Sequence, residues 1–204
     1  MSRMGRPKEH NAATRAALLQ AAEQMIATHG MDALSIRGVA DAVGTTTRAV
    51  YSLFESKAGL LQALAVRLFE LLDEAIGTVA LTDDPREDLA AAAIDGFRRV
   101  AIEHPSLYSL VFLRVVPDLQ LGSDFSAIAS ATFARLEALV ARVAEDDAGD
   151  IDVPQLALAV HALTEGLASV ELRQGVANPA AEQLWHDSVI ALVDGFPRRT
   201  SGHR

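Results

Sequence analysis

Residues 35–54 constrain the fold of this chain of 204 residues more than any other stretch. Ser35 is a suitable N-cap, because its hydroxyl can accept an amide hydrogen that the first helical turn leaves unsatisfied, and apolar residues follow it at helical spacing. Gly44 can then turn the chain sharply, since glycine adopts the left-handed conformation without a side-chain clash. Thr45 or Thr46 caps a second helix. The pattern predicts two short helices joined by a tight turn.

The second predicted helix, residues 47–54, has an apolar side and a polar side. Val50 and Phe54 lie four residues apart and can face the first helix, which leaves the polar side chains pointing outward. A helix that is held by its apolar side and shows polar groups on the other suits the major groove of DNA. Two ordinary amphipathic helices with a solvated face would give the same pattern. The outward residues are Thr47, Arg48, Tyr51 and Ser52.

Three runs resemble the N-terminal domain of the tetracycline-repressor (TetR) family: residues 35–44, 46–51 and 54–61, which read SIRGVADAVG, TTRAVY and FESKAGLL. A preceding helix that ends at Gly30 and the Tyr-x-x-Phe-x-x-Lys spacing complete the similarity. The resemblance implies a homodimeric, ligand-responsive transcription regulator, most often a repressor. Ser52 and Leu53 depart from the family's pattern, which often has an aromatic or histidine pair there.

Each polar residue of this region is expected to have its own contact with DNA. Arg48 can give a bidentate pair of hydrogen bonds to guanine, although a solvated charge is the simpler alternative. Lys57 matches the phosphate-contacting lysine of the family. Residues 1–8 are expected to form a flexible basic arm, from which Arg6 or Arg3 can enter the minor groove unless the arm has no role. The predicted DNA-binding residues are Arg6, Ser35, Thr46, Thr47, Arg48, Tyr51, Ser52 and Lys57.

Charge is divided unequally along the chain, whose formal net charge is −9. Residues 1–57 carry seven basic and five acidic groups, whereas the remainder carries 11 basic and 22 acidic groups. An acidic body is repelled by phosphates, so DNA is expected to meet the N-terminal end. We therefore expect a helix-turn-helix DNA-binding domain with its arm in residues 1–57, and a helical ligand-binding and dimerisation domain in residues 58–204.

The rest of the sequence predicts only further helices. A long helix is expected from Ser56 to about Ala80, and the next begins where Asp84 caps and Pro85 takes the first helical position. That helix is expected to run to about His104, with Glu87 completing a capping box. Further helices are expected at 106–116, roughly 124–146, from 154 into the 170s, and up to 195. The predicted fold class is all-α, with a three-helix DNA-binding domain followed by a helical body.

By resemblance, the body holds an apolar or amphipathic effector, and its last two helices form the dimer interface. An aromatic residue at helical spacing is more often plain core than a ligand contact. His161 and Glu165 could bind a metal or act as acid and base, but no third ligand is near, so a hydrogen bond to a ligand or partner is the better interpretation. Candidate ligand-binding residues are Phe97, Tyr108, Phe112, Phe133, His161 and Glu165. Candidate interface residues are Leu163, Leu167, Val170, Trp185, Val189 and Leu192.

Composition excludes several classes of protein. The absence of cysteine removes disulfides and thiolate sites. No apolar run is long enough for a membrane span and no signal peptide is visible, so a soluble cytoplasmic protein is expected. No phosphate loop, nucleophile elbow or zinc spacing is present, which predicts no enzyme, metal or cofactor.

The sequence thus predicts a homodimeric repressor that a small molecule releases from a palindromic double-stranded operator. A ligand-dependent activator or corepressor-dependent member, and a helical ligand-binding or protein-interaction dimer without sequence-specific DNA binding, remain as alternatives.

Overall fold

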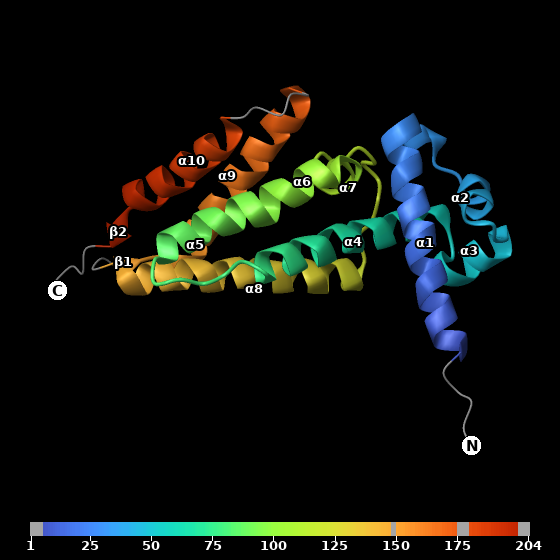
Figure 1. Ribbon diagram of the computed structural model, residues 1–204, viewed down its shortest axis with the longest axis horizontal. Coiled ribbons are helices and arrows are strands. Elements are labelled where there is room, and N and C mark those ends of the chain that lie inside the picture. Colours follow the sequence, from blue (N-terminus) through green and yellow to red (C-terminus); the bar gives the residue numbers. More distant parts are fainter. Residues whose placement is uncertain (1–5, 148–149, 175–179, 200–204) are drawn as a thin grey trace, which may run out of the picture. The chain divides into compact units, whose positions relative to one another are not determined.

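The computed structural model describes residues 6–147, 150–174 and 180–199 (Figure 1). Most of these residues are helical, which confirms the all-α class. The chain divides into two compact units, of which the first comprises residues 1–67 and 106–125 and the second comprises residues 68–105 and 126–204. Helix α4 contributes residues to both units.

In the first unit, helices α2 and α3 pack on each other and α1 packs on α2 (Figure 1). Its core includes Leu18, Leu34, Val39 and Val50, all nearly or completely buried. The elements of this unit are α1 (Arg6–His29), η1 (Met31–Ala33), α2 (Ile36–Val43), α3 (Thr47–Phe54), the first part of α4 (Lys57–Gly77) and most of α7 (Pro105–Val111).

The caps of this unit agree with those predicted. The Ser35 hydroxyl accepts from the amide of Gly38 at 3.1 Å, and the Thr46 hydroxyl accepts from that of Ala49 at 3.2 Å. Gly44 has a φ of 71°, the left-handed conformation expected at the turn. The structure therefore confirms two short helices joined by a tight turn.

Two boundaries in the first unit differ from the predictions. Helix α1 begins at Arg6, so the last three residues of the expected flexible arm are helical. The helix that opens at Pro105 ends at Val111 and does not continue to residue 116. The reason is backbone geometry, because Arg114 adopts a φ of 48°, which an α-helix cannot accommodate.

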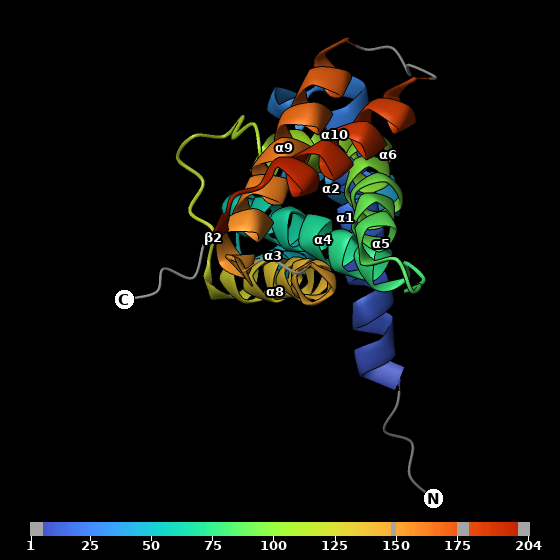
Figure 2. The ribbon, with the colours of Figure 1, turned by 90° about the vertical axis from the view of Figure 1, so that its left-hand side faces the viewer.

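In the second unit, α10 packs against α5 and α9, which lie on either side of it (Figure 2). Leu89, Leu156 and Trp185 are among the fully buried residues of these helices. The elements are the end of α4, α5 (Pro85–Ala91), η2 (Ala92–Arg98), α6 (Arg99–Glu103), α8 (Ser123–Asp146), β1 (Asp150–Ile151), α9 (Val153–Gln174), α10 (Ala181–Gly195) and β2 (Arg198–Arg199).

The predicted continuous helix from Pro85 to about His104 is interrupted by a π-helix, η2. The π register brings Gly96 against α4, where an added Cβ would lie 2.8 Å from the Ile76 side chain and 3.4 Å from its Cα. A side chain at residue 96 would collide with α4. The wider π turn therefore occurs where η2 packs closely on α4. Local sequence does not reveal this contact.

Two short strands were not predicted. β1 and β2 pair antiparallel, with residue 150 opposite residue 199 and residue 151 opposite residue 198. The ladder joins the segment before α9 to the segment after α10. Two-residue strands carry no periodicity that a sequence pattern could reveal.

Candidate DNA interface and effector region

Helix α3 presents its polar residues to solvent. Thr47 and Arg48 are exposed, and the Tyr51 side chain is 51% exposed. Ser52 is also exposed, although its hydroxyl donates to the Ala49 carbonyl at 2.9 Å. The opposite face is fixed because Val50 and Phe54 are buried. This is the arrangement that a helix needs to enter the major groove by its polar side.

The other predicted DNA-binding residues lie at helix termini. Ser35 and Thr46 are the exposed N-caps of α2 and α3. Lys57 is the exposed first residue of α4, where the Ser56 hydroxyl accepts from the Gly59 amide at 2.9 Å. Arg6 is the first residue of α1, and the position of its side chain lies outside the described part of the chain. Arg3 also lies outside the described residues.

Phe54, the last residue of α3, links three helices of the first unit. Its ring is buried, and the guanidinium of Arg15 from α1 lies 5.5 Å from the ring centroid. A cation over an aromatic face is attracted by the ring quadrupole. The C-terminal end of α3 is thus held by α1 on one side and by the start of α4 on the other.

In the second unit, four of the predicted ligand-binding residues come together. The ring of His161 on α9 lies 6.4 Å from Phe97 and 6.0 Å from Phe133, and both pairs are edge-to-face. Phe97 is buried, whereas His161 and Phe133 are half-buried. Glu165, one turn along α9, lies 3.7 Å from the Nε2 atom of His161. These four residues are the contiguous part of the predicted effector region.

Tyr108 and Phe112, both associated with α7, belong to the first unit. Their ring centroids are 4.9 Å apart with a tilted arrangement. Tyr108 is almost fully buried and Phe112 half-buried. The six predicted ligand residues therefore form two groups, one in each compact unit.

The predicted interface residues differ in how accessible they are to a second chain. Trp185 and Val189 are buried within the chain itself, which leaves them no surface for a partner. Both are core residues of the single chain, and the position of a dimer interface stays a prediction. Leu163, Leu167 and Leu192 are half-buried, and Val170 is 43% exposed.

Sequence reasoning missed a polar network around Trp185. The indole N–H donates to the Glu171 carboxylate at 3.1 Å, and Arg98 of η2 donates two hydrogen bonds to the same carboxylate, at 2.8 and 3.0 Å. Arg98 also pairs with Glu182 at 3.3 Å. The network joins η2, α9 and α10. Its hydrogen-bonded pairs lie 14 to 84 residues apart along the sequence, so no local spacing signals it.

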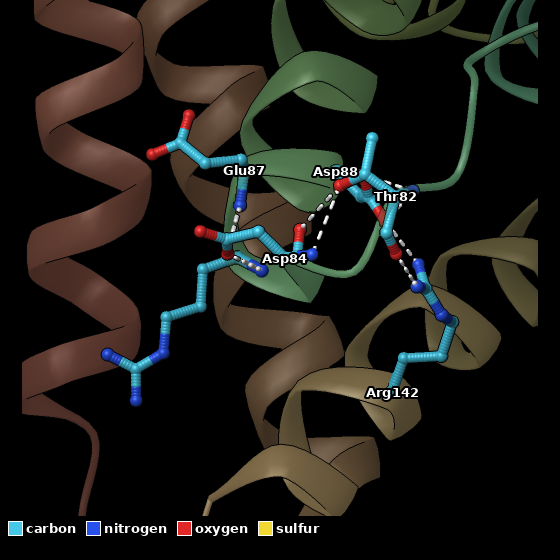
Figure 3. Close-up of polar contacts among 6 residues, drawn as sticks. Thr82, Asp84, Glu87, Asp88 and Arg142 are labelled. Carbon is cyan, nitrogen blue, oxygen red and sulfur yellow. Dashed lines mark hydrogen bonds and ion pairs between the residues drawn. The ribbon is translucent and has the colours of Figure 1, made fainter.

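A second missed cluster surrounds Asp88, which is only 2% exposed (Figure 3). Its carboxylate accepts hydrogen bonds from the amide and hydroxyl of Thr82 and from Arg142 of α8. Burial alone would raise the pKa of Asp88, but these hydrogen bonds and the charge of Arg142 outweigh burial and lower the pKa below its ordinary value. The cluster fixes the loop between α4 and α5 to α8.

The same loop corrects the predicted capping box. Asp84 caps α5 as expected, since its carboxylate accepts from the amides of Arg86 and Glu87. The amide of Asp84, however, donates to the Thr82 hydroxyl at 3.1 Å. Glu87 instead contacts His186 of α10, at 3.0 Å from its Nε2 atom, because α10 packs on this side of α5.

His186 lies between two carboxylates. Its Nδ1 atom is 3.2 Å from Asp187, and its Nε2 atom faces Glu87. These hydrogen bonds, first that with Asp187 and then that with Glu87, raise the pKa of His186 above its ordinary value. Among the described residues, no group of three or more histidine and acidic side chains could hold a metal ion. None of the described helices is long and apolar enough to cross a membrane.

Two family models match the chain. The model described as "Bacterial regulatory proteins, tetR family" matches residues 18–64 and so includes α2 and α3. The model described as "Tetracyclin repressor-like, C-terminal domain" matches residues 90–194, which is more than half of the chain. No curated protein matches the chain.

Solved structures of regulators share the fold. PfmR, a TetR family transcriptional regulator from Thermus thermophilus, is 21% identical, with 89% of this chain and 99% of that chain covered and a TM-score of 0.65. The fatty acid degradation regulator FadR from Bacillus halodurans is 17% identical, covers 97% and 100%, and has a TM-score of 0.72. RolR, solved with the ligand resorcinol, is 18% identical, covers 94% and 98%, and has a TM-score of 0.62.

The geometry of α2 and α3 and the two family matches agree with each other. The chain belongs to the TetR family of bacterial transcriptional regulators, with a DNA-binding N-terminal domain followed by a ligand-binding C-terminal domain.

Proposed function

We propose that the chain is a homodimeric repressor that binds a roughly palindromic operator, with one helix α3 in each half-site, and leaves it when a small molecule fills the body. The observation that carries the proposal is the exposed polar face of α3, held from behind by Val50 and Phe54. Arg48 reads a guanine, Tyr51 and Lys57 contact phosphates, and Thr47 contacts a phosphate or a thymine methyl group.

A second copy of the chain is the proposed partner of α9 and α10. On α9, the exposed residues Leu158, Ala162, Gly166 and Val170 recur every four residues and are all apolar or small. Leu184 is 54% exposed on α10, and Ala191 lies two turns further along. Pairing two such helix pairs about a two-fold axis would remove this apolar surface from water. Small residues at the contact allow a close approach of the helices.

The proposed effector is a small apolar or amphipathic molecule that contacts Phe97, Phe133 and His161. Two aromatic rings offer apolar surface, and the imidazole with its neighbour Glu165 offers hydrogen-bonding groups. Two solved structures of similar fold agree with an effector of this chemistry. One is a regulator of fatty acid degradation, and the other holds the ligand resorcinol.

The remaining proposals follow from this function. The DNA-binding domain is proposed to occupy residues 1–57, and the ligand-binding and dimerisation domain residues 58–204. A regulator of this kind works where the DNA is, so we expect the protein in the cytoplasm. Regulators of this family generally have no enzymatic activity, and we expect none here.

The first test is fluorescence anisotropy of the purified chain on the DNA upstream of its own gene and on a scrambled duplex, across a salt series. Tight binding that prefers the upstream DNA and weakens steeply with salt is the expected result, since phosphate neutralisation releases counterions. A random-sequence selection then covers the case of a distant operator. A chain that selects no sequence in either experiment is not a sequence-specific repressor.

A panel of small aromatic and acyl compounds, added to the protein–DNA complex, tests the direction of the response. Release of the DNA supports a repressor that the effector inactivates. A compound that strengthens DNA binding would instead show a ligand-dependent activator or a corepressor-dependent member.

A further inference from the structure

The connection between the recognition helix α3 and α4 has an unusual backbone. Glu55 has a φ of 62° and a ψ of −39°, and the Ser56 amide donates to the Phe54 carbonyl at 2.6 Å. A hydrogen bond that spans three residues about a positive central φ defines a γ-turn of the rare, strained kind. Residues with a side chain seldom adopt such a φ, and the strain persists only where the surroundings impose it.

The surroundings of this turn are crowded by the backbone of α4. A Cβ added to Gly59 would lie 1.9 Å from the carbonyl oxygen of Phe54 and 3.1 Å from its carbonyl carbon. The neighbour is main chain and not a flexible side chain, so it cannot move aside by changing a rotamer. Only glycine at residue 59 allows the end of α3 to approach the first turn of α4 this closely.

Both ends of the turn are anchored. The Phe54 ring is buried and lies beneath the guanidinium of Arg15, while the Ser56 hydroxyl caps α4 at the Gly59 amide. With both ends fixed, the γ-turn leaves α3 a single angle relative to the start of α4. Lys57 and the polar face of α3 are therefore presented to DNA in one fixed geometry.

We propose that Phe54–Glu55–Ser56 forms a rigid elbow that orients the recognition helix, and that Glu55 and Gly59 are positioning residues for the reading of DNA sequence. They act through α3, without touching DNA themselves. The inference rests on the proposed function. Base contacts depend on a matched hydrogen-bond geometry, whereas phosphate contacts tolerate a small rotation, so a loosened elbow reduces sequence preference more than total affinity.

The experiment uses the full-length chain, the duplex that the unaltered chain selects from a random-sequence pool, and a scrambled duplex. The readout is the affinity for the selected duplex divided by the affinity for the scrambled duplex. Gly59→Ala should lower this ratio about 5- to 100-fold, the range for a lost bidentate base contact, while affinity for the scrambled duplex at low salt is retained. Gly122→Ala is the control, because an added Cβ there meets no atom within 4 Å, and it should leave the ratio unchanged.

Glu55→Gly separates orientation from folding. Glycine accepts the positive φ without strain, so the melting temperature should rise by about 2–4 °C. The same change lets the elbow adopt other angles, so the affinity ratio should fall by roughly two- to fivefold. If Glu55 only supported the fold, its substitution would not raise the melting temperature and lower the affinity ratio together.

The outcomes are distinct. Failure of the unaltered chain to select any sequence overturns the proposed function and the elbow together. Selection by the unaltered chain with an unchanged ratio in Glu55→Gly and Gly59→Ala overturns the elbow alone. If Gly59→Ala does not fold, Glu55→Gly decides: a higher melting temperature with an unchanged ratio rejects the inference, and a lower ratio supports it.

Discussion

The two compact units use their polar side chains differently. In the first unit, the hydroxyls of Ser35, Thr46 and Ser56 each accept from an amide three residues away, and the polar face of α3 stays exposed. In the second unit, basic side chains bridge separate elements. Its pairs between elements, within the described residues, include Arg86 with Asp194, Arg98 with Glu171, Arg135 with Asp73, Arg142 with Asp88 and His186 with Glu87.

The difference separates binding from stability. A charged side chain that is paired with one on another helix is not available to bind a ligand. The charged side chains on α3 contribute little to folding, because they remain in water. Substitutions in the second unit should therefore act first on unfolding, and substitutions on α3 should act first on DNA binding. Any residue that reverses this order would break the comparison.

The largest effect is expected for Asp88→Ala. The change leaves Arg142 and the Thr82 amide without their carboxylate, in a place where Asp88 is 2% exposed. The free energy of unfolding should fall by about 3 kcal/mol, as measured by chemical denaturation. The loss should be smaller at acid pH, because a carboxyl with a lowered pKa stabilises the fold only while it is ionised, and its contribution disappears as the pH falls through that pKa.

The matched control is Glu103→Ala, which removes a carboxylate from an exposed pair with Arg99 at 3.7 Å. Exposed pairs of this kind contribute about 0.5 kcal/mol or less. Equal losses from the two substitutions would show that the buried cluster has no special weight.

The next effect is on binding. Arg48→Ala should weaken binding to the selected duplex by about 1–3 kcal/mol and relax preference at one position in each half-site. The unfolding free energy should change by less than about 0.5 kcal/mol, because the side chain lies on an exposed face. Arg37→Ala, on the exposed face of α2, is the control. Uniform weakening on every sequence would contradict the base-reading role.

A smaller effect is expected for Trp185→Phe. The change removes the N–H that donates to Glu171 and part of a fully buried ring, which should lower the unfolding free energy by about 1–2 kcal/mol. Sedimentation at fixed concentration should show the same oligomeric state before and after. A dissociated protein with unchanged stability would place Trp185 at the surface between copies and contradict its assignment to the core.

The smallest effect concerns His186. Its raised pKa means that protonation stabilises the fold, with the contribution complete below the ordinary histidine value and lost as the pH rises through the raised pKa. Glu87→Gln should lower the pKa of His186, leaving Asp187 as its remaining carboxylate, as followed by NMR titration of the ring. Glu103→Gln should leave that titration unchanged.

Local signals predicted the first unit well. Each cap and the turn at Gly44 depends on residues within one helical turn, so the sequence contains the whole interaction. Two boundaries are exceptions: α1 begins at Arg6, within the expected arm, and the φ of Arg114 ends the helix after Pro105 five residues early. Exposure of the α3 residues followed from the apolar pair behind them.

The second unit was predicted only as a set of helices. The π register of η2 accompanies a close contact between Gly96 and Ile76, and the Trp185 network joins residues from three elements. Such contacts depend on tertiary packing that no periodicity encodes. Among the candidate ligand residues, spacing could relate His161 to Glu165, whereas their proximity to Phe97 and Phe133 required the fold.

The ladder between β1 and β2 closes the pair α9 and α10 into a loop. Because the chain before α9 is paired with the chain after α10, the two ends of the segment from residue 151 to residue 198 are held together by main-chain hydrogen bonds. The entropic cost of closing a loop grows only slowly with its length, so two residue pairs are a small addition to the packing of α9 against α10. The ladder therefore fixes the start of α9 beside the end of α10.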